Sequence, residues 1–339
     1  EENKELSIYE EKFKKSWVYK ELHQARNVKP SFSWGLILGI IFTGIDQILF
    51  RGKLPLTLKH KHADHETLKL ANEMPKIDYP KPDFIIHAAS IASPLYYRKY
   101  PIETIDANVT GLRNLLDFSK ENHIESFLFF STSEIYGDPD PAYIPTNEDY
   151  RGNVSCTGSR ACYDESKRFG ETLCVNYWQI HNVPVKIARP FNNYGPGLKI
   201  TDKRVIPDFF RDVINNRDIV ILSDGKASRT FCYISDAIEG YIRILLSNHN
   251  GEPFNIGAKN PEVSMGELAQ HIISISGKNL DVKYQTSSDP DYLTDNPQRR
   301  CPSIDKAEKL LGYDPKINLE EGLKRTYDYY TAHPEAEES

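Results

Sequence analysis

Two ionisable side chains four residues apart, Tyr163 and Lys167, give the sequence its clearest chemical pattern. On a helix this spacing places both side chains on one face, one turn apart. A phenol has an unperturbed pKa of about 10, and a neighbouring ammonium group favours its ionised form. We therefore expect Tyr163 to act as a general base toward an alcohol, with Lys167 supporting it.

A second polar cluster, Ser131-Thr132-Ser133-Glu134, follows the apolar run 127–130, which predicts a buried strand. Hydroxyl and carboxylate groups at the C-terminal end of such a strand lie where open α/β sheets bind ligands. Taken alone, the tyrosine–lysine pair also fits a solvated helix surface, and Glu134 fits an ordinary strand-end carboxylate. Only the ordered set of motifs along the chain makes the functional interpretation specific.

From residue 84 onward, short apolar runs alternate with helical patterns. Asn108, inside the first long helix, is the kind of polar residue that reaches back to a site. Further along, mixed segments predict helices near 206–215, 236–247 and 264–276. The alternation of apolar runs and helical patterns predicts a parallel α/β fold with strands at 84–87, 127–131 and 185–189 and helices at 102–122 and 163–181.

Composition and charge are those of a soluble globular protein. Hydrophobic residues make up 39% of the chain and charged residues 27%, and the net charge of −6 argues against nucleic-acid binding. The five cysteines lack a CxxC or zinc spacing, so we expect free thiols, no metal site and a reducing compartment. The Glu/Lys-rich start has no signal-peptide pattern, and the expected location is cytoplasmic.

Charge is distributed unevenly between two parts of the chain. Residues 1–82 carry 14 Lys and Arg against 11 Asp and Glu, and the remainder carries 28 against 37. All five cysteines lie in the second part. The sequence therefore predicts a helical segment at 1–82 and an α/β domain at 83–339.

The first part contains a predicted amphipathic helix at 9–25, and Pro30 is expected to end any helix before it. The apolar stretch 34–50 that follows is shorter than the ~20 residues of a membrane span. Cations come after it at Arg51, Lys53, Lys59 and Lys61. Two interpretations stay open: a buried core helix, or contact with a membrane surface through residues 34–61 and hence membrane association.

Several spaced motifs resemble the extended short-chain dehydrogenase/reductase family, the NAD-dependent sugar-nucleotide epimerases, dehydratases and decarboxylases. The resemblance implies a Rossmann-like domain, NAD, a UDP-sugar substrate, a homodimer formed through the Tyr163 helix, and a smaller α+β lid mainly at 191–234 and 253–310. The motifs are His87-Ala88-Ala89-Ser90, Ser131 to Gly137, Tyr163-x-x-x-Lys167, Ala188 to Pro196, Arg229 to Asp236 and Phe254 to Gly257.

The resemblance also assigns roles to individual residues. Two assignments have plain alternatives, because Arg300 also fits a solvated loop charge and Asn192 a simple turn residue. The implied catalytic residues are Thr132, Ser133, Glu134, Tyr163, Lys167 and Arg229. The implied cofactor-binding residues are His87, Ala88, Ala89, Ser90, Asn108, Ser131, Tyr163 and Lys167. The implied substrate-binding residues are Asn192, Arg204, Arg229 and Arg300.

The pair Ser133-Glu134 resembles the UDP-glucuronate decarboxylase pattern. The 4,6-dehydratases carry Asp-Glu there, and the 4-epimerases usually have no acid at either position. Oxidation at C4 of the sugar makes a β-keto acid that loses CO₂ readily, and Glu134 is expected to protonate the resulting enolate directly or through water. A dehydratase or an epimerase remains the alternative activity.

Residues 8–82 resemble a different family, an internal segment of electron-transfer flavoprotein–ubiquinone oxidoreductase, without its flavin motif or cluster cysteines. This apparent fusion replaces the strand, glycine-rich turn and helix that normally hold the NAD pyrophosphate. The glycines at 35, 39, 44 and 52 do not form that turn. We therefore expect weak or absent NAD binding, impaired activity and an exposed edge at strand 84–87. The alternative function is an inactive binding or membrane-tethered remnant.

Overall fold

The structure is a computed structural model that describes residues 13–58, 81–289, 294 and 296–333. The chain forms two compact units, Glu1–Tyr79 and Pro80–Ser339. This division lies close to the predicted boundary between residues 82 and 83.

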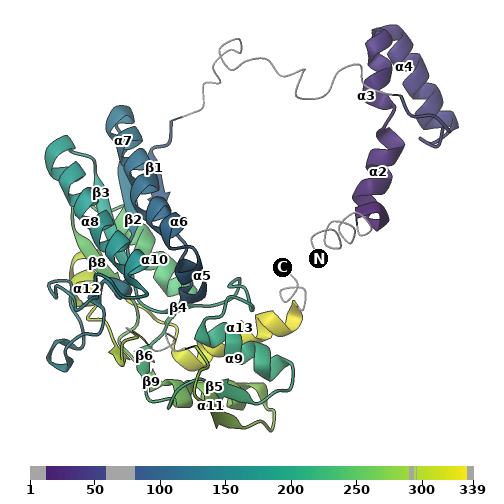
Figure 1. Ribbon diagram of the computed structural model, residues 1–339. Helices are drawn as coiled ribbons and strands as arrows, with labels where there is room; N and C mark the ends of the chain where they lie inside the picture. Colours follow the sequence, from purple (N-terminus) through teal and green to yellow (C-terminus); the bar gives the residue numbers. More distant parts are fainter. Residues whose placement is uncertain (1–12, 59–80, 290–293, 295, 334–339) are drawn as a thin grey trace. The chain divides into compact units, whose positions relative to one another are not determined.

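The N-terminal unit is mostly helical between residues 13 and 49 (Figure 1). Ser16 begins α2, because its side chain accepts a hydrogen bond from the amide of Tyr19. The predicted helix at 9–25 is thus present from Trp17, and its residues 9–12 lie outside the described part. None of the described helices has the length and apolarity to cross a bilayer. The elements are α2 (Trp17–Ala25), α3 (Val28–Ser31), the 3₁₀ helix η1 (Phe32–Trp34), α4 (Leu36–Gly44) and the π-helix η2 (Ile45–Leu49).

Pro30 does not separate the helices as predicted. The first helix ends earlier, at Ala25, and Pro30 is the third residue of the short helix α3. A proline is tolerated in a first helical turn, because the amide it lacks would have no intrahelical partner there.

The C-terminal unit is built on a four-stranded parallel sheet with the order β1-β2-β3-β8. The strands predicted at 84–87, 127–131 and 185–189 are confirmed to within one residue. The fourth strand comes from the motif ending at Gly257. The strands are β1 (Phe84–His87), β2 (Ser126–Phe130), β3 (Val185–Pro190) and β8 (Pro253–Ile256).

Helices cover both faces of this sheet (Figure 1). Alternate strand residues such as Phe127 and Phe129 pack under α7 (Leu112–Asn122) and α8 (Ala161–His181). The intervening residues, including Leu128, pack against α10 (Ile234–Leu245) on the other face. Two apolar faces are the reason that the strands are continuously hydrophobic, as expected of a parallel sheet.

The helix predicted at 102–122 is present, but its winding changes along its length. It begins as α6 (Pro101–Ile105), continues as the π-helix η5 (Asp106–Gly111) and ends as α7. Asn108 lies buried inside the π-helical turn. Such turns often occur at functional sites, because the wider winding re-aims side chains.

A smaller α+β part packs its own core between α9 (Val205–Ile214), α11 (Met265–Ser276) and α13 (Leu319–Ala332). The predicted lid, residues 191–234 and 253–310, supplies α9 and α11 to this core, whereas α13 lies outside the predicted ranges. The remaining elements are α5 (Pro94–Lys99), η6 (Ser133–Tyr136), η7 (Pro141–Tyr143), β4 (Asn193–Tyr194), β5 (Ile219–Ile221), β6 (Ser228–Thr230), β7 (Cys232–Tyr233), β9 (Glu262–Ser264), β10 (Val282–Tyr284), β11 (Arg299–Arg300) and α12 (Asp305–Leu311).

Strand β1 is the edge of the sheet among the described residues, as predicted, because it pairs with β2 alone. Phe84 and Ile86 are 43% and 54% exposed there. An apolar edge with unpaired backbone groups is a surface on which chains associate.

Replacing Gly170 with alanine should destabilise the unit by about 1–3 kcal/mol, the usual effect of overpacking a core. A Cβ on Gly170 would lie 2.6 Å from the ring of Phe129 and 3.2 Å from Leu112, so α8 sits directly against the sheet. The control is Gly111→Ala, whose Cβ meets nothing closer than 3.8 Å. Urea unfolding checks both variants; equal stability of the two would show that α8 is free to shift.

Candidate active site

The first two turns of α8 carry Tyr163 and Lys167, and both side chains are buried. The Lys167 ammonium lies 5.9 Å from the centre of the Tyr163 ring and donates a 2.7 Å hydrogen bond to the carbonyl oxygen of Phe130. The helix therefore brings the pair together as the spacing predicts and anchors it to the end of β2.

Burial dominates the ionisation of this pair. It raises the pKa of Tyr163 well above its usual value, and a hydrogen bond with the Thr132 side chain acts in the opposite direction. Burial also lowers the pKa of Lys167 to about 8. The expected lowering of the tyrosine pKa by Lys167 is therefore outweighed by desolvation of the phenolate.

The polar cluster after β2 forms the tight turn η6. Thr132 begins it, and its hydroxyl oxygen accepts a 3.2 Å hydrogen bond from the amide of Glu134. Ser133 is buried within the turn. This capping bond fixes the backbone at Glu134.

Glu134 is held by two arginines from distant parts of the chain. Arg160, just before α8, donates to it at 2.6 Å. Arg300, on β11 of the lid, donates to both carboxylate oxygens at 2.5 and 2.7 Å. Arg300 is buried, so its interpretation as a solvated loop charge is wrong.

The arginines keep Glu134 ionised. Burial alone would raise the pKa of Glu134, but the charges of Arg300 and Arg160 outweigh it and lower the pKa to about 2. A carboxylate that accepts three N–H bonds and titrates near pH 2 carries no proton at neutral pH. The structure is therefore at odds with direct protonation by Glu134.

Arg229 completes a group of three guanidinium ions. It lies on β6 opposite Arg300 in the β6–β11 ladder. Burial and then the charge of Arg300 lower its pKa to about 9. Its donors go to the carbonyl oxygens of Ser228, Pro297 and Gln298, not to a carboxylate. The site thus holds more cationic than anionic groups.

The residues implied for the nicotinamide end of the cofactor lie at the ends of β1 and in the π-helical turn. The buried Nε2 of His87, the hydroxyl of Ser90 and Oδ1 of Asn108 have no hydrogen-bond partner in the described residues. Burial, followed by the charge of Lys167, lowers the His87 pKa to about 4. Ala88 and Ala89 follow β1 and are exposed. These neutral polar atoms are able to form hydrogen bonds with the uncharged amide and ribose of a nicotinamide cofactor.

Two substrate candidates lie at the lid. Asn192 has a positive φ of 44° and donates a 2.9 Å hydrogen bond to the Thr230 carbonyl oxygen, which is the geometry of a turn residue. Arg204 begins α9, forms an ion pair with Asp202, and its charge acts to lower the pKa of Tyr163. The charge of Arg204 thus reaches Tyr163, and Asn192 shapes a loop of the same part of the fold.

Sequence reasoning missed a buried network beneath the site. Ser131 donates to Glu171 at 2.5 Å, and Glu171 pairs with Arg189 through hydrogen bonds of 2.6 and 2.9 Å. Arg189 donates to the Tyr136 hydroxyl at 2.7 Å, and that hydroxyl donates to Asn255 at 2.7 Å. The network joins β2, α8, β3 and β8. Arg189 lies inside the 188–196 motif, and its place there is the sequence feature that could have indicated this network.

Tyr97 was also missed. Its ring stacks on that of Tyr163, with centres 5.0 Å apart and planes 9° apart. The guanidinium of Arg160 lies 5.9 Å from the Tyr97 ring centre. Nothing in the local sequence of α5 marks this residue, whereas the three-residue spacing of Arg160 from Tyr163 was a usable signal.

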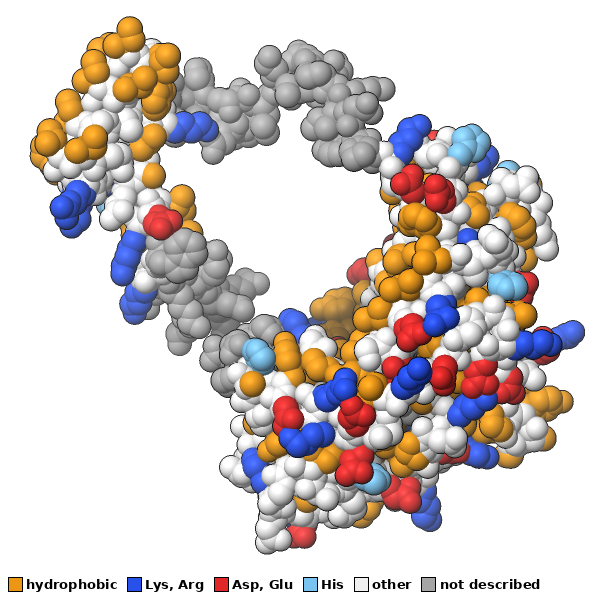
Figure 2. Space-filling model, turned by 180° about the vertical axis from the view of Figure 1, so that it is seen from behind, with side chains coloured by type: hydrophobic (Ala, Val, Ile, Leu, Met, Phe, Trp, Pro, Cys, Tyr) orange, Lys and Arg blue, Asp and Glu red, His pale blue; other side chains and the backbone are white. Residues whose placement is uncertain are grey.

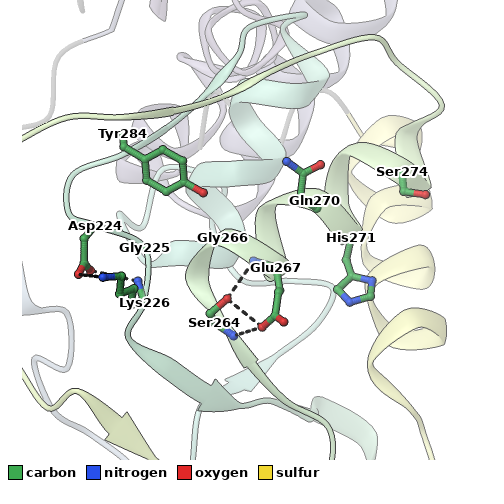
Figure 3. A pocket seen from close by; sticks show the side chains of 10 residues that line it. All are labelled: Asp224, Gly225, Lys226, Ser264, Gly266, Glu267, Gln270, His271, Ser274 and Tyr284. Atoms are coloured by element: carbon green, nitrogen blue, oxygen red, sulfur yellow. Dashed lines mark hydrogen bonds and ion pairs between the residues drawn. The ribbon is translucent and has the colours of Figure 1, made fainter.

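A separate cleft of about 840 Å³ lies on the lid beside α11 (Figure 3). Its walls include Lys226, His271 and Tyr284, and none of the predicted site residues lines it. Ser264 and Glu267 hydrogen-bond each other in a capping box that uses the donors at the start of α11. The cleft is therefore not part of the candidate active site.

No group of three His, Cys, Asp or Glu side chains suited to a metal ion occurs within residues 13–58, 81–289, 294 and 296–333. The five cysteines are free thiols.

The sequence profile of the NAD dependent epimerase/dehydratase family matches residues 58–257. The chain belongs to this family. The match begins earlier than the predicted start at Phe84, so residues 58–82 fall inside it. That overlap corrects the assignment of 58–82 to a flavoprotein-like segment, for which these comparisons provide no support.

Individual relatives agree with the family assignment. The chain is 40% identical over 242 residues to UDP-glucuronic acid decarboxylase 3 of Arabidopsis thaliana, covering 71% of this chain and 68% of that protein. It is 38% identical over 269 residues to UDP-glucuronic acid decarboxylase 1 of Danio rerio, covering 79% of this chain and 62% of the relative.

The fold also matches solved structures of the family. UDP-glucuronic acid 4-epimerase of Bacillus cereus, solved in complex with NAD, superimposes with a TM-score of 0.63 at 27% identity. The match covers 75% of this chain and 74% of that one. The chain is thus a Rossmann-like, NAD-dependent sugar-nucleotide-modifying type of enzyme.

Replacing Arg300 with methionine should lower the free energy of unfolding at pH 7 by about 3–5 kcal/mol, because it leaves Glu134 buried with one partner fewer. The loss should shrink as pH falls from about 4.5 toward 2. The lowered pKa of Glu134 contributes stability that is fully present above pH 4.5, the pKa of this group in the unfolded chain. That stability is lost as the pH falls to about 2.

Arg299→Met is the matched control, because Arg299 is 45% exposed where Arg300 is 6% exposed. Its ion pair with Glu262 should contribute only about 0–1 kcal/mol. Urea denaturation at pH 7 and pH 3 measures both variants. Equal, pH-independent losses would contradict the central position of the Glu134–Arg300 pair.

Proposed function

We propose that the C-terminal unit is an NAD-dependent sugar-nucleotide decarboxylase that acts on UDP-glucuronate. The observation that carries this proposal is the convergence of three buried guanidinium groups, those of Arg160, Arg229 and Arg300, around the carboxylate of Glu134, which forms ion pairs with Arg160 and Arg300. The carboxylates of Asp164 and Asp138 also act on Arg160 and Arg229. An excess of buried cations suits a substrate that brings its own carboxylate. The decarboxylases among the relatives support the same reaction class.

In the proposed mechanism, Tyr163 removes the proton from the 4-hydroxyl of the sugar, and Thr132 orients that hydroxyl. Bound NAD would supply the oxidising chemistry at C4. The resulting β-keto acid loses CO₂ without a strong acid, so serine at position 133 is sufficient. Lys167 holds the tyrosine and the end of β2 in place through its bond to Phe130.

Glu134 acts in this scheme through water. Because its pKa is about 2, it accepts hydrogen bonds and does not itself donate a proton near neutrality. It would orient a water molecule that protonates the carbanion left by CO₂. A 4,6-dehydratase would need an acid where Ser133 stands, so that alternative and the 4-epimerase alternative are less well supported.

NAD binding is the weak step of the proposed function. The unpaired atoms of His87, Ser90 and Asn108 fit the nicotinamide end. The pyrophosphate is normally held by backbone amides of a glycine-rich turn at a helix N-terminus. The sequence before residue 83 contains no such turn. We therefore propose that this chain retains the chemistry at C4 and has a weakened cofactor site.

The chain as it stands should show a rise in melting temperature with UDP and none with NAD⁺ up to millimolar concentration. A chimera with the first βαβ segment of the Arabidopsis thaliana relative placed before residue 83 should gain an NAD⁺-dependent shift. It should release CO₂ from UDP-glucuronate. In the chimera, Tyr163→Phe should lower turnover by about 10²–10⁴-fold with UDP binding unchanged.

Product masses and thermal shifts measure these outcomes. A saturable shift of the natural chain at micromolar NAD⁺ would show that the weakened-site proposal is wrong. A 4-keto-6-deoxy product without CO₂ would instead identify a dehydratase. Normal turnover of the Tyr163→Phe chimera would assign the base to another group.

Self-association as a homodimer is also part of the proposal. The helices near the tyrosine have uncovered apolar side chains, at Ile102 on α6, Phe118 on α7 and Phe169 on α8. Exposed apolar side chains on adjacent helices are typical of a helix-mediated interface.

A second function is favoured by the N-terminal unit, which has an inverted distribution of polarity. Large apolar side chains of α4 and η2 face outward; Ile37 and Ile48 are 74% and 78% exposed. Three polar side chains, those of Asn27, Ser31 and Asp46, are buried instead, and Ser31 hydrogen-bonds Thr43 at 3.0 Å. The exposure of these side chains favours the membrane-surface interpretation of residues 34–50 over the buried-core-helix interpretation.

We propose that this surface contacts a membrane interface, without spanning the bilayer. Figure 2 shows orange hydrophobic side chains over much of the unit. The described part of the proposed contact is residues 34–58, and 59–61 lie outside it. On this view the chain joins a membrane-contacting segment to a sugar-nucleotide enzyme domain.

The full chain should sediment with phosphatidylcholine vesicles, and Ile37→Gln combined with Ile48→Gln should weaken this binding by about tenfold. Two buried isoleucines contribute a few kcal/mol of apolar transfer at most, and interfacial burial is partial. Ile238→Gln with Ile242→Gln, two exposed positions on α10, is the control. Recovery of the natural chain entirely in the supernatant would refute membrane contact.

A further inference from the structure

A second cleft, of about 410 Å³, lies within the N-terminal unit between one side of α2 and the segment 52–55. Tyr19, Lys20 and His23 line it from the helix, and Lys53 lines it from the opposite wall. Residues three and four apart on a helix share a face, so these donors point into one space. The hydroxyl, imidazole and ammonium groups are all able to donate hydrogen bonds to an anion.

Among the described residues 13–58, no acidic residue lines this cleft. Residues 13–58 contain seven Lys and Arg against two acidic residues, Glu21 and Asp46. Within the described residues, neither Lys20 nor Lys53 has a carboxylate partner, whereas most lysines in ion pairs belong to the other unit. Uncompensated cations around a concave space create a positive potential that attracts a negatively charged group.

Arg26 fixes the shape of the cleft. Its guanidinium donates to the carbonyl oxygens of Gly52 at 2.7 Å and Leu54 at 2.5 Å, and to the Thr57 hydroxyl at 3.1 Å. These bonds tie the end of α2 to the opposite wall and leave the positive charge of Arg26 unneutralised. The cleft is therefore a built feature of the unit rather than a gap between mobile lysines.

Gly52 makes the close approach of the two walls feasible. Its φ is +69°, and a Cβ there would lie 2.5 Å from the carbonyl oxygen of Gln24. Only glycine combines this backbone conformation with that contact. The cationic wall at Lys53 consequently has a fixed position relative to Lys20.

Apolar side chains adjoin the cleft along the chain. Ile48, Leu49 and Phe50 are 78%, 73% and 47% exposed and directly precede the wall that begins at Arg51. A free phosphate ion would gain nothing from this neighbouring apolar surface. An amphiphile with a phosphate group and acyl chains would contact both the cationic cleft and the apolar side chains, because its charged head is directly attached to its apolar tails.

We propose that the cleft binds the phosphate group of an anionic phospholipid. Lys20, Lys53, His23 and Tyr19 contact the phosphate, and the apolar residues of α4 and η2 lie against the acyl region. This inference rests on the membrane contact proposed above and adds a specific headgroup site to it. The preferred ligand is a phosphate monoester, because its additional charge and oxygens match several donors.

The test compares binding of the full chain to vesicles that contain phosphatidic acid and vesicles that contain phosphatidylserine, matched in zeta potential. The natural chain should prefer phosphatidic acid by about tenfold or more. Lys20→Ala with Lys53→Ala should reduce this ratio to about 1. Lys15→Ala with Lys29→Ala removes the same charge from exposed positions that do not line the cleft, and it should keep the ratio.

The ratio separates the cleft from diffuse attraction, because both variants lose the same charge. A ratio near 1 for the natural chain, or an equal fall in the control variant, overturns the headgroup site while membrane contact stands. Failure to bind any vesicle, including phosphatidylcholine, overturns the membrane contact itself. Glycerol phosphate binding in solution as tightly as the vesicles would overturn a lipid as the ligand.

Discussion

The contact between Glu134 and its arginines is the interaction on which the C-terminal unit depends. It joins the end of β2, the start of α8 and the lid strand β11, three pieces that are distant in sequence. In a buried setting, neither partner is tolerated without the other. The position of the lid over Tyr163 is therefore fixed by charge as much as by apolar packing, and the same cations give the site its preference for anions.

The sequence predicted the parts of the fold that are encoded locally. The strand at 84–87, the α8 helix and the Tyr163–Lys167 pair follow from period and spacing alone. The Glu134–Arg300 pair did not, because its partners are 166 positions apart in the sequence and Arg300 is placed by the register of β11 against β6. The tyrosine pKa was also misjudged, since sequence reveals a neighbouring charge more readily than the desolvation that opposes it.

The two units differ in which side chains they bury and which they expose. The C-terminal unit covers both faces of its sheet with helices and encloses its charges in pairs and networks. The N-terminal unit encloses Ser31 and Asp46 and presents isoleucines outward. Because the hydrophobic effect rewards only apolar surface removed from water, the second arrangement is stable where something other than water covers it.

The buried network below the site has an evolutionary consequence. The network is a series of hydrogen-bonded side chains: Glu171, Arg189, Tyr136 and Asn255. Replacing any one of them leaves a buried polar group of its neighbour without a hydrogen-bond partner. Substitutions at these positions are tolerable only in compensating combinations, and a lineage moving by single changes meets a barrier at every one. The lid surface and the strand edge can accept single substitutions. The four residues of the buried network are instead expected to change jointly.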